Sequence, residues 1–367
     1  MRALNFYAGP RALAHLRERG LAPRDVRAIP AAAGGPKGLV LSHLDRFIFG
    51  DWLRDSRHTV HLLGASIGAW RMATGCLEDP RAAFARMADD YIRQEYEHKP
   101  GKAPKPSHVS ALFAAKLDDC FAGREAQVLS HPRFRLHVFT SRGRHLLRRE
   151  GRFLSSVSTP LGYLGAFASN AVHRRALGGW LERIVFSDPR DALPVPLRDF
   201  STRFATLNET NLRLSVLASC SIPFWLEAVH DIPGAPRGAY WDGGLTDYHL
   251  HLPYAAMAAA ANDDGAGLVL YPHFQKAVVP GWLDKVLKHR HRSSPHLANV
   301  VVVAPNPEWV ATLPGGKLPD RNDFVRYADD PAPRIQAWSR AVAESAQLAD
   351  EFAQAVQSGP IDSVQPL

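Results

Sequence analysis

The fold of this chain is decided by the stretch Thr59-Val60-His61-Leu62-Leu63-Gly64-Ala65-Ser66-Ile67-Gly68-Ala69-Trp70, in which an apolar run of strand character ends in Gly-x-Ser-x-Gly and continues into a helix-compatible segment. This order is typical of a nucleophile elbow, a sharp strand-to-helix turn that leaves a serine hydroxyl exposed at the edge of a sheet. Gly64 and Gly68 lack the Cβ atoms that would clash across so tight a turn. The pattern predicts Ser66 as a nucleophile. The competing interpretation is a small-residue helix start packed against a sheet.

A second strand, turn and helix precede the elbow. Residues 26–32 read as a buried strand, and Gly34-Gly35-Pro36-Lys37-Gly38 leads into an apolar helical pattern over residues 39–52. The turn lacks the Gly-Lys-Ser/Thr of a phosphate-binding P-loop, which excludes that type of nucleotide site. Backbone N–H groups at a helix N-terminus can instead stabilise an oxyanion. Because a right-handed crossover makes the two strands parallel, we expect Gly34 and Gly35 to lie at the same sheet edge as Ser66.

The remainder of the chain continues the alternation of helices and strands. Helical patterns cover residues 80–98, the residues leading to Phe121, and residues 212–220 and 335–356; strand patterns cover residues 133–140, 184–186, 203–207, 268–271 and 299–304, and a short strand ends at Tyr240-Trp241-Asp242-Gly243-Gly244. This alternation predicts a three-layer α/β/α fold with a mostly parallel central sheet. We expect one domain over residues 1–367, with a lid or surface insertion around residues 141–180 and a C-terminal helical region around residues 331–358.

Composition restricts the compartment and the partners. The chain has three cysteines, which lie far apart and form no Cys-x-x-Cys, so a disulfide framework or zinc knuckle is disfavoured and a reducing compartment fits best. The N-terminal residues lack the apolar segment of a signal peptide, and we expect a cytoplasmic protein. The formal net charge of +8 indicates an anionic partner. Nucleic acid is disfavoured, because no aromatic residues are interleaved with the basic runs.

The longest uncharged stretch runs from Phe153 to Val172. It has about the length of a membrane span, but Thr159, Pro160, Asn170 and several serines make it too polar for one. Arginines flank it on both sides, at positions 142, 144, 148, 149, 152, 174 and 175. An apolar patch rimmed by arginines suits peripheral contact with an anionic membrane. The competing interpretation is a solvated charged loop beside an ordinary core helix.

Four blocks carry a resemblance to a known family. They are Gly34-Gly35-Pro36-Lys37-Gly38, Gly64-Ala65-Ser66-Ile67-Gly68, Ala218-Ser219-Cys220-Ser221-Ile222-Pro223 and Asp242-Gly243-Gly244. In order and approximate spacing, over about residues 26–250, the chain resembles the patatin-like phospholipases. The resemblance implies a three-layer α/β/α fold and hydrolysis of lipid esters by a Ser66–Asp242 dyad, with Gly34 and Gly35 as oxyanion donors. Pro36 stands where members often carry a third glycine, and Thr246-Asp247-Tyr248-His249 replaces a common Asn-x-Pro.

The residues considered for the substrate pocket are Lys37, Ile67, Pro223, Phe224 and Trp225. We expect a lipid ester as the substrate and neither a cofactor nor a metal ion.

Two other functions remain open. One is an α/β-hydrolase esterase with a triad of Ser66, Asp242 and His249, His251 or His273. The other is a non-catalytic lipid-binding protein on the same fold, although the presence of both Ser66 and Asp242 favours an enzyme. His249-x-His251 has the spacing of metal ligands, but no third ligand at a telling spacing accompanies it, and alternation along a strand explains the pair.

Overall fold

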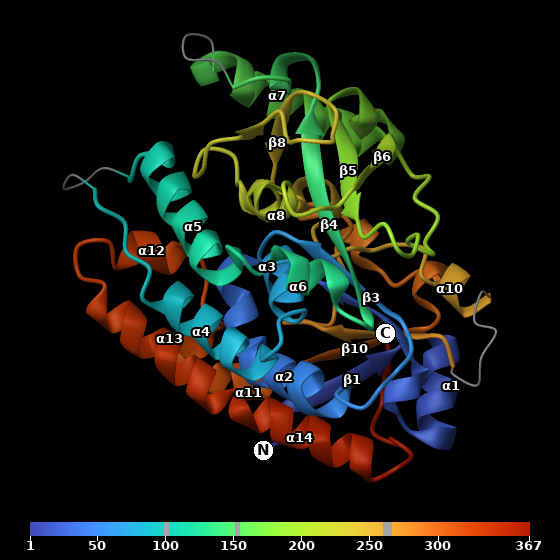
Figure 1. Cartoon of the computed structure of the whole chain (residues 1–367). Coiled ribbons are helices and arrows are strands. Elements are labelled where there is room, and N and C mark those ends of the chain that lie inside the picture. Colours follow the sequence, from blue (N-terminus) through green and yellow to red (C-terminus); the bar gives the residue numbers. More distant parts are fainter. Residues whose placement is uncertain (99–102, 151–154, 260–265) are drawn as a thin grey trace.

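The computed structural model describes residues 1–98, 103–150, 155–259 and 266–367, which form one sheet of eleven strands with helices packed against it (Figure 1). The strands are β1 (Leu4–Ala8), β2 (Val26–Ala31), β3 (Val60–Ala65), β4 (Phe134–Gly143), β5 (Leu181–Ser187), β6 (Thr202–Thr206), β7 (Val229–His230), β8 (Ala239–Trp241), β9 (Leu268–Pro272), β10 (Val300–Pro305) and β11 (Gln365–Pro366). Their order in the sheet is β11-β1-β10-β9-β2-β3-β4-β5-β6, and β8 joins β4 and β7 to one side of this path.

The central strands are parallel, as predicted for an α/β fold. β3 pairs in parallel with β2, with Ile29 opposite Leu62, and with β4, with Leu62 opposite Leu136. β2 also pairs in parallel with β9, and β9 with β10. Antiparallel pairing occurs between β1 and β10, between β4 and both β5 and β8, and between β7 and β8. The predicted mostly parallel central sheet is therefore confirmed.

The helices are α1 (Pro10–Arg19), α2 (Ser42–Phe47), α3 (Ile67–Thr74), α4 (Pro80–Ile92), α5 (Pro106–Phe121), α6 (Glu125–Ser130), α7 (Ser155–Val172), α8 (Leu212–Cys220), α9 (Gly244–Asp247), α10 (Ala255–Ala259), α11 (Pro307–Thr312), α12 (Asn322–Arg326), α13 (Ala332–Glu344) and α14 (Ala346–Gln357). Within the described residues, no helix combines the length and the apolar composition that crossing a membrane requires.

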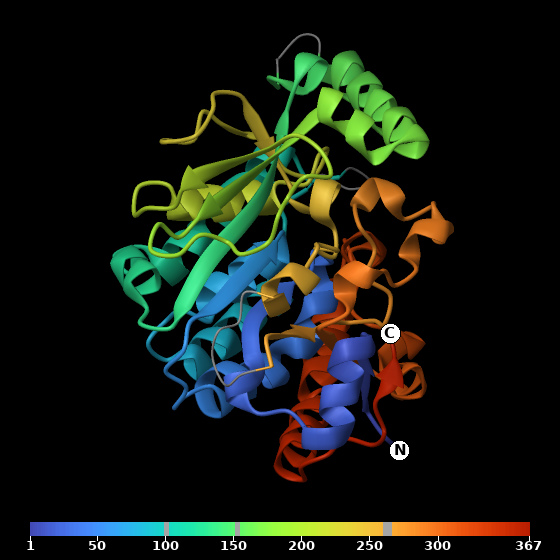
Figure 2. The ribbon, with the colours of Figure 1, turned by 90° about the vertical axis from the view of Figure 1, so that its right-hand side faces the viewer.

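Both faces of the sheet are covered. Because side chains alternate along a strand, neighbouring residues of β3 enter different clusters. Leu62 belongs to a buried cluster with residues of α2, α3, α8 and α14, whereas Leu63 belongs to a second cluster that includes Tyr254 and Met257. Figure 1, together with the perpendicular view in Figure 2, shows the sheet enclosed between these two layers. The predicted three-layer α/β/α class is the observed one.

Several predicted helices differ from the observed ones. The helix predicted over residues 80–98 ends at Ile92, and that over residues 39–52 is a succession of the 3₁₀-helix η2 (Gly35–Leu41), α2 and a π-helical turn, η3 (Ile48–Trp52). The single helix predicted over residues 335–356 is wrong, because α13 and α14 meet at Ser345. Its hydroxyl donates to the carbonyl of Val342 at 2.7 Å, a local bond that competes with helix continuation. The pattern analysis did not identify β1, β11 or α1.

The insertion was predicted around residues 141–180; residues 141–143 are the last residues of β4, and residues 144–180 lie between β4 and β5 and include the 3₁₀-helices η4 (His145–Leu147) and η5 (Arg174–Gly179) beside α7. α7, drawn in green, lies at the top of both ribbon views, at the end of the sheet where β4 and β5 meet (Figures 1 and 2). Arg152, Phe153 and Leu154 of the predicted arginine-flanked stretch lie outside the described residues.

A buried ion network attaches this insertion to the segments around it. Arg183 of β5 is fully buried and donates two hydrogen bonds to Asp247 of α9, at 2.6 and 2.7 Å. Asp284 accepts hydrogen bonds from Asn170 of α7 and from Arg290, both at 2.8 Å. Because unpaired buried charges are costly, these bonds restrict how far α7 can move relative to the chain that follows β8.

Candidate active site

Ser66 stands at the turn between β3 and α3. Its backbone has φ 57° and ψ −132°, in a region that residues with a side chain rarely adopt. A Cβ on Gly64 would lie 2.3 Å from the Cα of Ala69, and one on Gly68 would lie 2.0 Å from the carbonyl oxygen of Ala31. A side chain at either glycine would therefore force the turn open.

The Ser66 hydroxyl donates a hydrogen bond of 2.6 Å to Oδ2 of Asp242, the residue that follows β8. The other carboxylate oxygen, Oδ1, accepts the N–H of Gly244 at 2.6 Å. A Cβ on Gly244 would lie 2.6 Å from the Cβ of Ala33, so the close approach of these two loops needs a glycine there. Ser66 and Asp242 are 4% and 6% exposed, respectively. The pair is a hydroxyl and a carboxylate in direct contact, largely shielded from water.

The C-terminal end of α8 holds both members of this pair. The N–H of Ser66 donates to Oγ of Ser219 at 2.8 Å, and that hydroxyl donates to the carbonyl of Phe139 at 2.7 Å. The N–H of Asp242 donates to the carbonyl of Ser221 at 2.9 Å. Sequence reasoning assigned no role to Ser219. The sequence feature that could have pointed to Ser219 is its position in the third of the four blocks, between the Ser66 elbow and Asp242-Gly243-Gly244.

Burial raises the pKa of Asp242 to about 6. The hydrogen bonds from Ser66 and Gly244 and the positive charges of Arg321 and Lys285 act in the opposite direction and keep the pKa from rising further. At neutral pH the carboxylate is ionised, yet it is a stronger proton acceptor than an exposed aspartate. This combination suits a general base.

Three backbone N–H groups near Ser66 donate no hydrogen bond within the described residues: those of Gly34, Gly35 and Ile67. Gly35 is the first residue of η2 and has φ +56°, and Ile67 is the first residue of α3. Pro36 has no N–H and can contribute none. Unpaired N–H groups at helix N-termini are suited to stabilising negative charge. The Ile67 N–H was not among the donors expected from the sequence.

A cavity of about 570 Å³ opens beside the Ser66–Asp242 pair. Gly34, Ser66 and Asp242 form part of its wall, and the other lining side chains are mostly apolar and aromatic. They come from α7 (Pro160, Tyr163, Leu164, Phe167), from the segment after α8 (Ile222, Pro223, Phe224, Trp225) and from the segment after β8 (Leu245, Tyr248, Trp282, Leu283). Arg321 also lines it. Such a cavity has the size and character of a site for an apolar small molecule.

The residues predicted to line the pocket fall into three groups. Pro223, Phe224 and Trp225 line this cavity. Ile67 lines a second, small cavity of about 40 Å³ that also reaches Ser66 and Gly35. Lys37 lines neither, and its ammonium lies 5.4 Å from the ring centre of Phe274. The α7 residues and Arg321 were missed, because nothing in their local sequence relates them to Ser66.

No histidine hydrogen-bonds to Ser66 or Asp242 in the part of the chain that the structure describes. Nδ1 of His249 accepts the N–H of Val279 at 3.0 Å, and Nδ1 of His273 accepts the N–H of Gln275 at 3.0 Å. His251 bonds to the carbonyl of Val278 and to Ser294. Burial lowers the pKa of all three imidazoles. Over the same residues, no group of three or more His, Cys, Asp or Glu side chains is placed to hold a metal ion.

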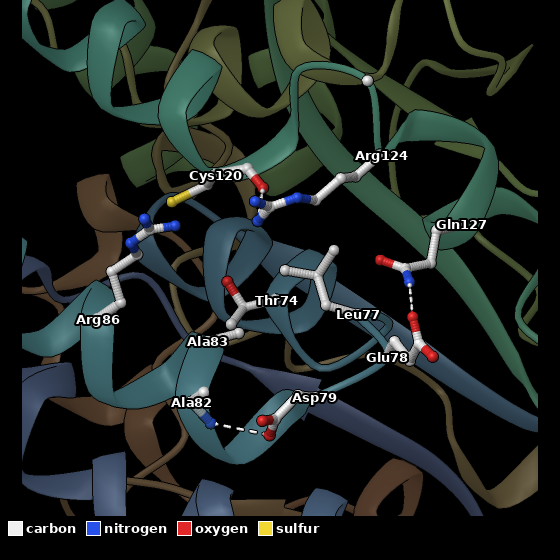
Figure 3. A pocket seen from close by; sticks show the side chains of 11 residues that line it. Thr74, Leu77, Glu78, Asp79, Ala82, Ala83, Arg86, Cys120, Arg124 and Gln127 are labelled. Atoms are coloured by element: carbon white, nitrogen blue, oxygen red, sulfur yellow. Dashed lines mark hydrogen bonds between the residues drawn. The ribbon is translucent and has the colours of Figure 1, made fainter.

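A larger cavity of about 710 Å³ lies elsewhere, lined by residues of α3 to α6 and the turns between them. Figure 3 shows Arg86 and Arg124 extending toward Cys120 on one side and Gln127 bonded to Glu78 on the other. Burial raises the pKa of the Cys120 thiol, so it is not an activated nucleophile. The described lining of this cavity includes no serine and no paired nucleophile and base, whereas the Ser66 cavity has both, so the Ser66 cavity is the candidate active site.

No model of a known protein family matches the chain, and no match to a curated protein was found. Among solved structures, the chain is similar to VipD from Legionella pneumophila, with a TM-score of 0.39 and 12% identity, over 91% of this chain and 67% of that chain. At this identity and TM-score the two chains share too little for a function to be transferred. The chemistry of this chain rests on its own side chains.

Proposed function

We propose that this protein is a serine acyl hydrolase that cleaves carboxylic esters of lipids, with Ser66 as nucleophile and Asp242 as general base. The observation that carries the proposal is the 2.6 Å hydrogen bond from Ser66 to Asp242 at the wall of a largely apolar cavity. The four sequence blocks that resemble the patatin-like phospholipases support it independently. Gly34, Gly35 and Ile67 are the proposed oxyanion donors.

Acylation starts when Oγ of Ser66 attacks the carbonyl carbon of the ester and its proton moves to Oδ2 of Asp242. The carbonyl oxygen becomes negatively charged in the tetrahedral intermediate, and the unpaired backbone N–H groups stabilise it. The bond from the carbonyl carbon to the alcohol oxygen then breaks, and Asp242 gives its proton to the departing alcohol. The acyl group remains on Ser66 as an ester.

Deacylation repeats these steps with water as the nucleophile. Asp242 takes a proton from the water as its oxygen attacks the acyl carbon, and the same N–H groups stabilise the second intermediate. When this intermediate collapses, Oγ of Ser66 leaves and recovers a proton from Asp242. The products are a fatty acid and the free enzyme, and no histidine is needed as an intermediary.

We also propose that the mouth of the cavity docks on an anionic membrane surface. Three cavity-lining side chains are unusually exposed for their type: Leu164 at 62%, Phe224 at 61% and Trp282 at 48%. They come from three distant segments, and Lys285 lies 5.8 Å from the ring of Trp282. Exposed apolar and aromatic residues beside a cation suit the headgroup region of a bilayer.

Labelling with a fluorophosphonate tests the nucleophile. Wild type should react and Ser66→Ala should not, while Ser215→Ala, which removes a buried α8 hydroxyl that donates to the carbonyl of Leu212 in the same helix, should react like wild type. In parallel, wild type should release fatty acid from lipid vesicles and Ser66→Ala should not. Equal labelling of wild type and Ser66→Ala would refute the proposal. Vesicle binding without labelling or fatty acid release would identify a non-catalytic lipid-binding protein instead.

A further inference from the structure

Arg321 has no side-chain partner within the described residues, although it is partly buried at the candidate active site. It immediately precedes α12 and lines both the 570 Å³ cavity and the small cavity, each of which reaches Ser66. Its Nη2 atom lies 3.9 Å from the position that a Cβ on Gly35 would occupy. Its positive charge lowers the pKa values of Asp242 and Tyr248, which both line the 570 Å³ cavity.

Two lysines lie close to this region, although neither is among the residues that line the two cavities. The Lys285 ammonium lies 4.3 Å from the ring centre of Tyr248, and the Lys37 ammonium lies over Phe274. Neither ammonium forms a hydrogen bond or an ion pair within the described residues. Burial, together with the like charges of Lys37 and Arg321, lowers the pKa of Lys285 to about 8. Lys285, Lys37 and Arg321 therefore form a group of neighbouring cations that is only partly exposed to solvent.

The acidic residues nearby do not neutralise this group. Asp242 is the one acidic residue in the described lining of the 570 Å³ cavity, and it accepts the hydrogen bond from Ser66. Asp320 and Asp323 both accept hydrogen bonds from Lys317 at 2.7 Å. Asp284, next to Lys285 in sequence, is bonded to Asn170 and Arg290. The ionised Asp242 offsets part of this positive charge, since it raises the pKa of Lys285 against the effect of burial. The remaining excess of partly buried positive charge is unfavourable, and an anionic ligand would offset that cost.

From this arrangement we infer that Arg321 and Lys285 form a subsite for the anionic group of an amphiphilic substrate, whose apolar chain lies against the α7 side of the cavity. The inference rests on the proposed function in that the anionic group belongs to the ester that Ser66 cleaves. A guanidinium can donate two parallel hydrogen bonds to a phosphate or carboxylate, and an ammonium adds a point charge. The subsite thus selects anionic lipid esters over neutral ones.

Binding to the Ser66→Ala protein tests the inference without requiring turnover. Isothermal titration calorimetry with decyl phosphate, decyl maltoside and inorganic phosphate separates the anionic group from the chain. Decyl phosphate should bind most tightly. Adding Arg321→Met or Lys285→Met should weaken its binding by about tenfold to a hundredfold, the range for hydrogen bonds to charged groups. Arg326→Met, which removes an exposed arginine that lines neither cavity at Ser66, should leave it unchanged.

Three binding results would overturn the inference. These are equal affinity for decyl maltoside and decyl phosphate, equal affinity for inorganic phosphate and decyl phosphate, and unchanged decyl phosphate binding in both Met variants. Because the side chains of Arg321 and Lys285 make no hydrogen bonds within the described residues, both variants should fold, which circular dichroism verifies, and Arg321→Lys should restore part of the affinity. A failure of wild type to hydrolyse any ester would refute the proposed function and leave these binding results valid.

Kinetics on the active protein provide a second readout. On an anionic and a neutral ester with the same acyl chain, compared on the pH plateau where Asp242 is ionised in both proteins, Arg321→Met should reduce the ratio of kcat/KM for the anionic ester to kcat/KM for the neutral ester by about tenfold or more. An equal loss on both esters would mean that Arg321 acts on the reacting atoms common to them, and the assignment of a subsite for the anionic group would be wrong.

Discussion

The backbone N–H of Ser66 donates a 2.8 Å hydrogen bond to the hydroxyl of Ser219, a residue 153 positions later in the chain. Since the same hydroxyl donates to the carbonyl of Phe139 in β4, one side chain connects the elbow, the central sheet and α8. Two residues after Ser219, the carbonyl of Ser221 accepts the N–H of Asp242. Nucleophile and base are thus positioned by one short segment at the end of α8.

Replacing Ser219 by alanine should disturb the elbow. The substitution leaves a buried N–H and a buried C=O unpaired, so we expect a loss of about 1–3 kcal/mol in the free energy of unfolding. We also expect kcat/KM to fall by about tenfold to a hundredfold, because small displacements of a nucleophile are costly. Urea unfolding and ester hydrolysis measure the two effects. Ser215→Ala on the same helix is the control, and if both variants behaved alike, Ser219 would have no special positioning role.

Asp242→Asn should separate activity from stability. It removes the proposed base while preserving the side-chain shape, so hydrolysis should fall by about 10²–10⁴-fold. The folded protein should not lose stability at pH 7.5, since the substitution removes a buried charge whose raised pKa shows that folding disfavours it. Thermal unfolding beside a kinetic assay checks both. Full activity in this variant, with inactive His249→Ala or His273→Ala proteins that remain folded, would favour the triad.

The pH dependence should report the raised pKa of Asp242. Because the ionised form is the base, kcat/KM should rise with pH around an apparent pKa of about 6 and then level off. Arg321→Met removes a positive charge that lowers this pKa, so it should move the rise to higher pH. Rates measured from pH 4.5 to 7.5 test this. An acidic limb that is centred near pH 4, or that is unaffected by the loss of Arg321, would contradict it.

The same shift has a consequence for folding. The unfolded aspartate has a pKa near 3.9, so between about pH 4 and pH 6 the folded state binds more protons at Asp242 than the unfolded state. This residue therefore makes the free energy of unfolding decrease as pH rises through that window. Asp242→Asn should lack this contribution, and its stability relative to wild type should increase from pH 4 to pH 6.5. Chemical denaturation at four pH values measures the difference.

The buried network around Arg183 should matter more than exposed ion pairs. Asp247→Ala removes one of the two carboxylates that pair with the buried Arg183 guanidinium, while Asp199 remains bonded to it, and we expect a loss of about 1.5–3 kcal/mol in the free energy of unfolding. The control is Glu344→Ala, which breaks a surface pair with Arg340 one helical turn away and should cost about 0.3–0.5 kcal/mol. Denaturant midpoints should differ accordingly. Similar losses in the two variants would show that burial of the network adds nothing.

The exposed mouth of the cavity should control vesicle binding. Trp282→Asp and Leu164→Asp place a negative charge where apolar contact with lipid is proposed, and each should reduce co-sedimentation with anionic vesicles severalfold. Wild-type binding should weaken as salt increases, because the electrostatic part is screened. Val325→Asp, on α12 and equally exposed but outside the lining of this cavity, is the matched control. An equal reduction in all three variants would show that net charge, rather than the mouth, governs binding.

The sequence predicted the central features well, because they rest on local patterns. The strands around Ile29 and Leu62 are apolar on both faces, as buried parallel strands must be, and the glycines at 64 and 68 indicate a tight turn. Helix ends were predicted less accurately. The boundary between α13 and α14 at Ser345 falls inside a continuous amphipathic pattern, and periodicity does not record it.

The residues that surround the candidate site could not be predicted from local sequence patterns. Tyr163, Trp282 and Arg321 meet around Ser66 only because the sheet and the ion network bring three remote segments together. No spacing rule relates an arginine at position 321 to a serine at position 66. The unpaired state of the Arg321 side chain within the described residues is likewise a property of the folded molecule, since two aspartates within two positions of it, Asp320 and Asp323, could have been its partners.

The left-handed backbone of Ser66 has an evolutionary consequence. A side chain held at φ 57° costs of the order of 1–3 kcal/mol, which a glycine would largely avoid. Ser66→Gly is thus a variant that relieves strain and removes the hydroxyl. In a library of variants, selection for heat resistance should enrich glycine at this position, whereas selection for ester turnover should eliminate it. The opposite outcomes of two selections at one codon would measure how much stability this chain gives up to hold one hydroxyl in place.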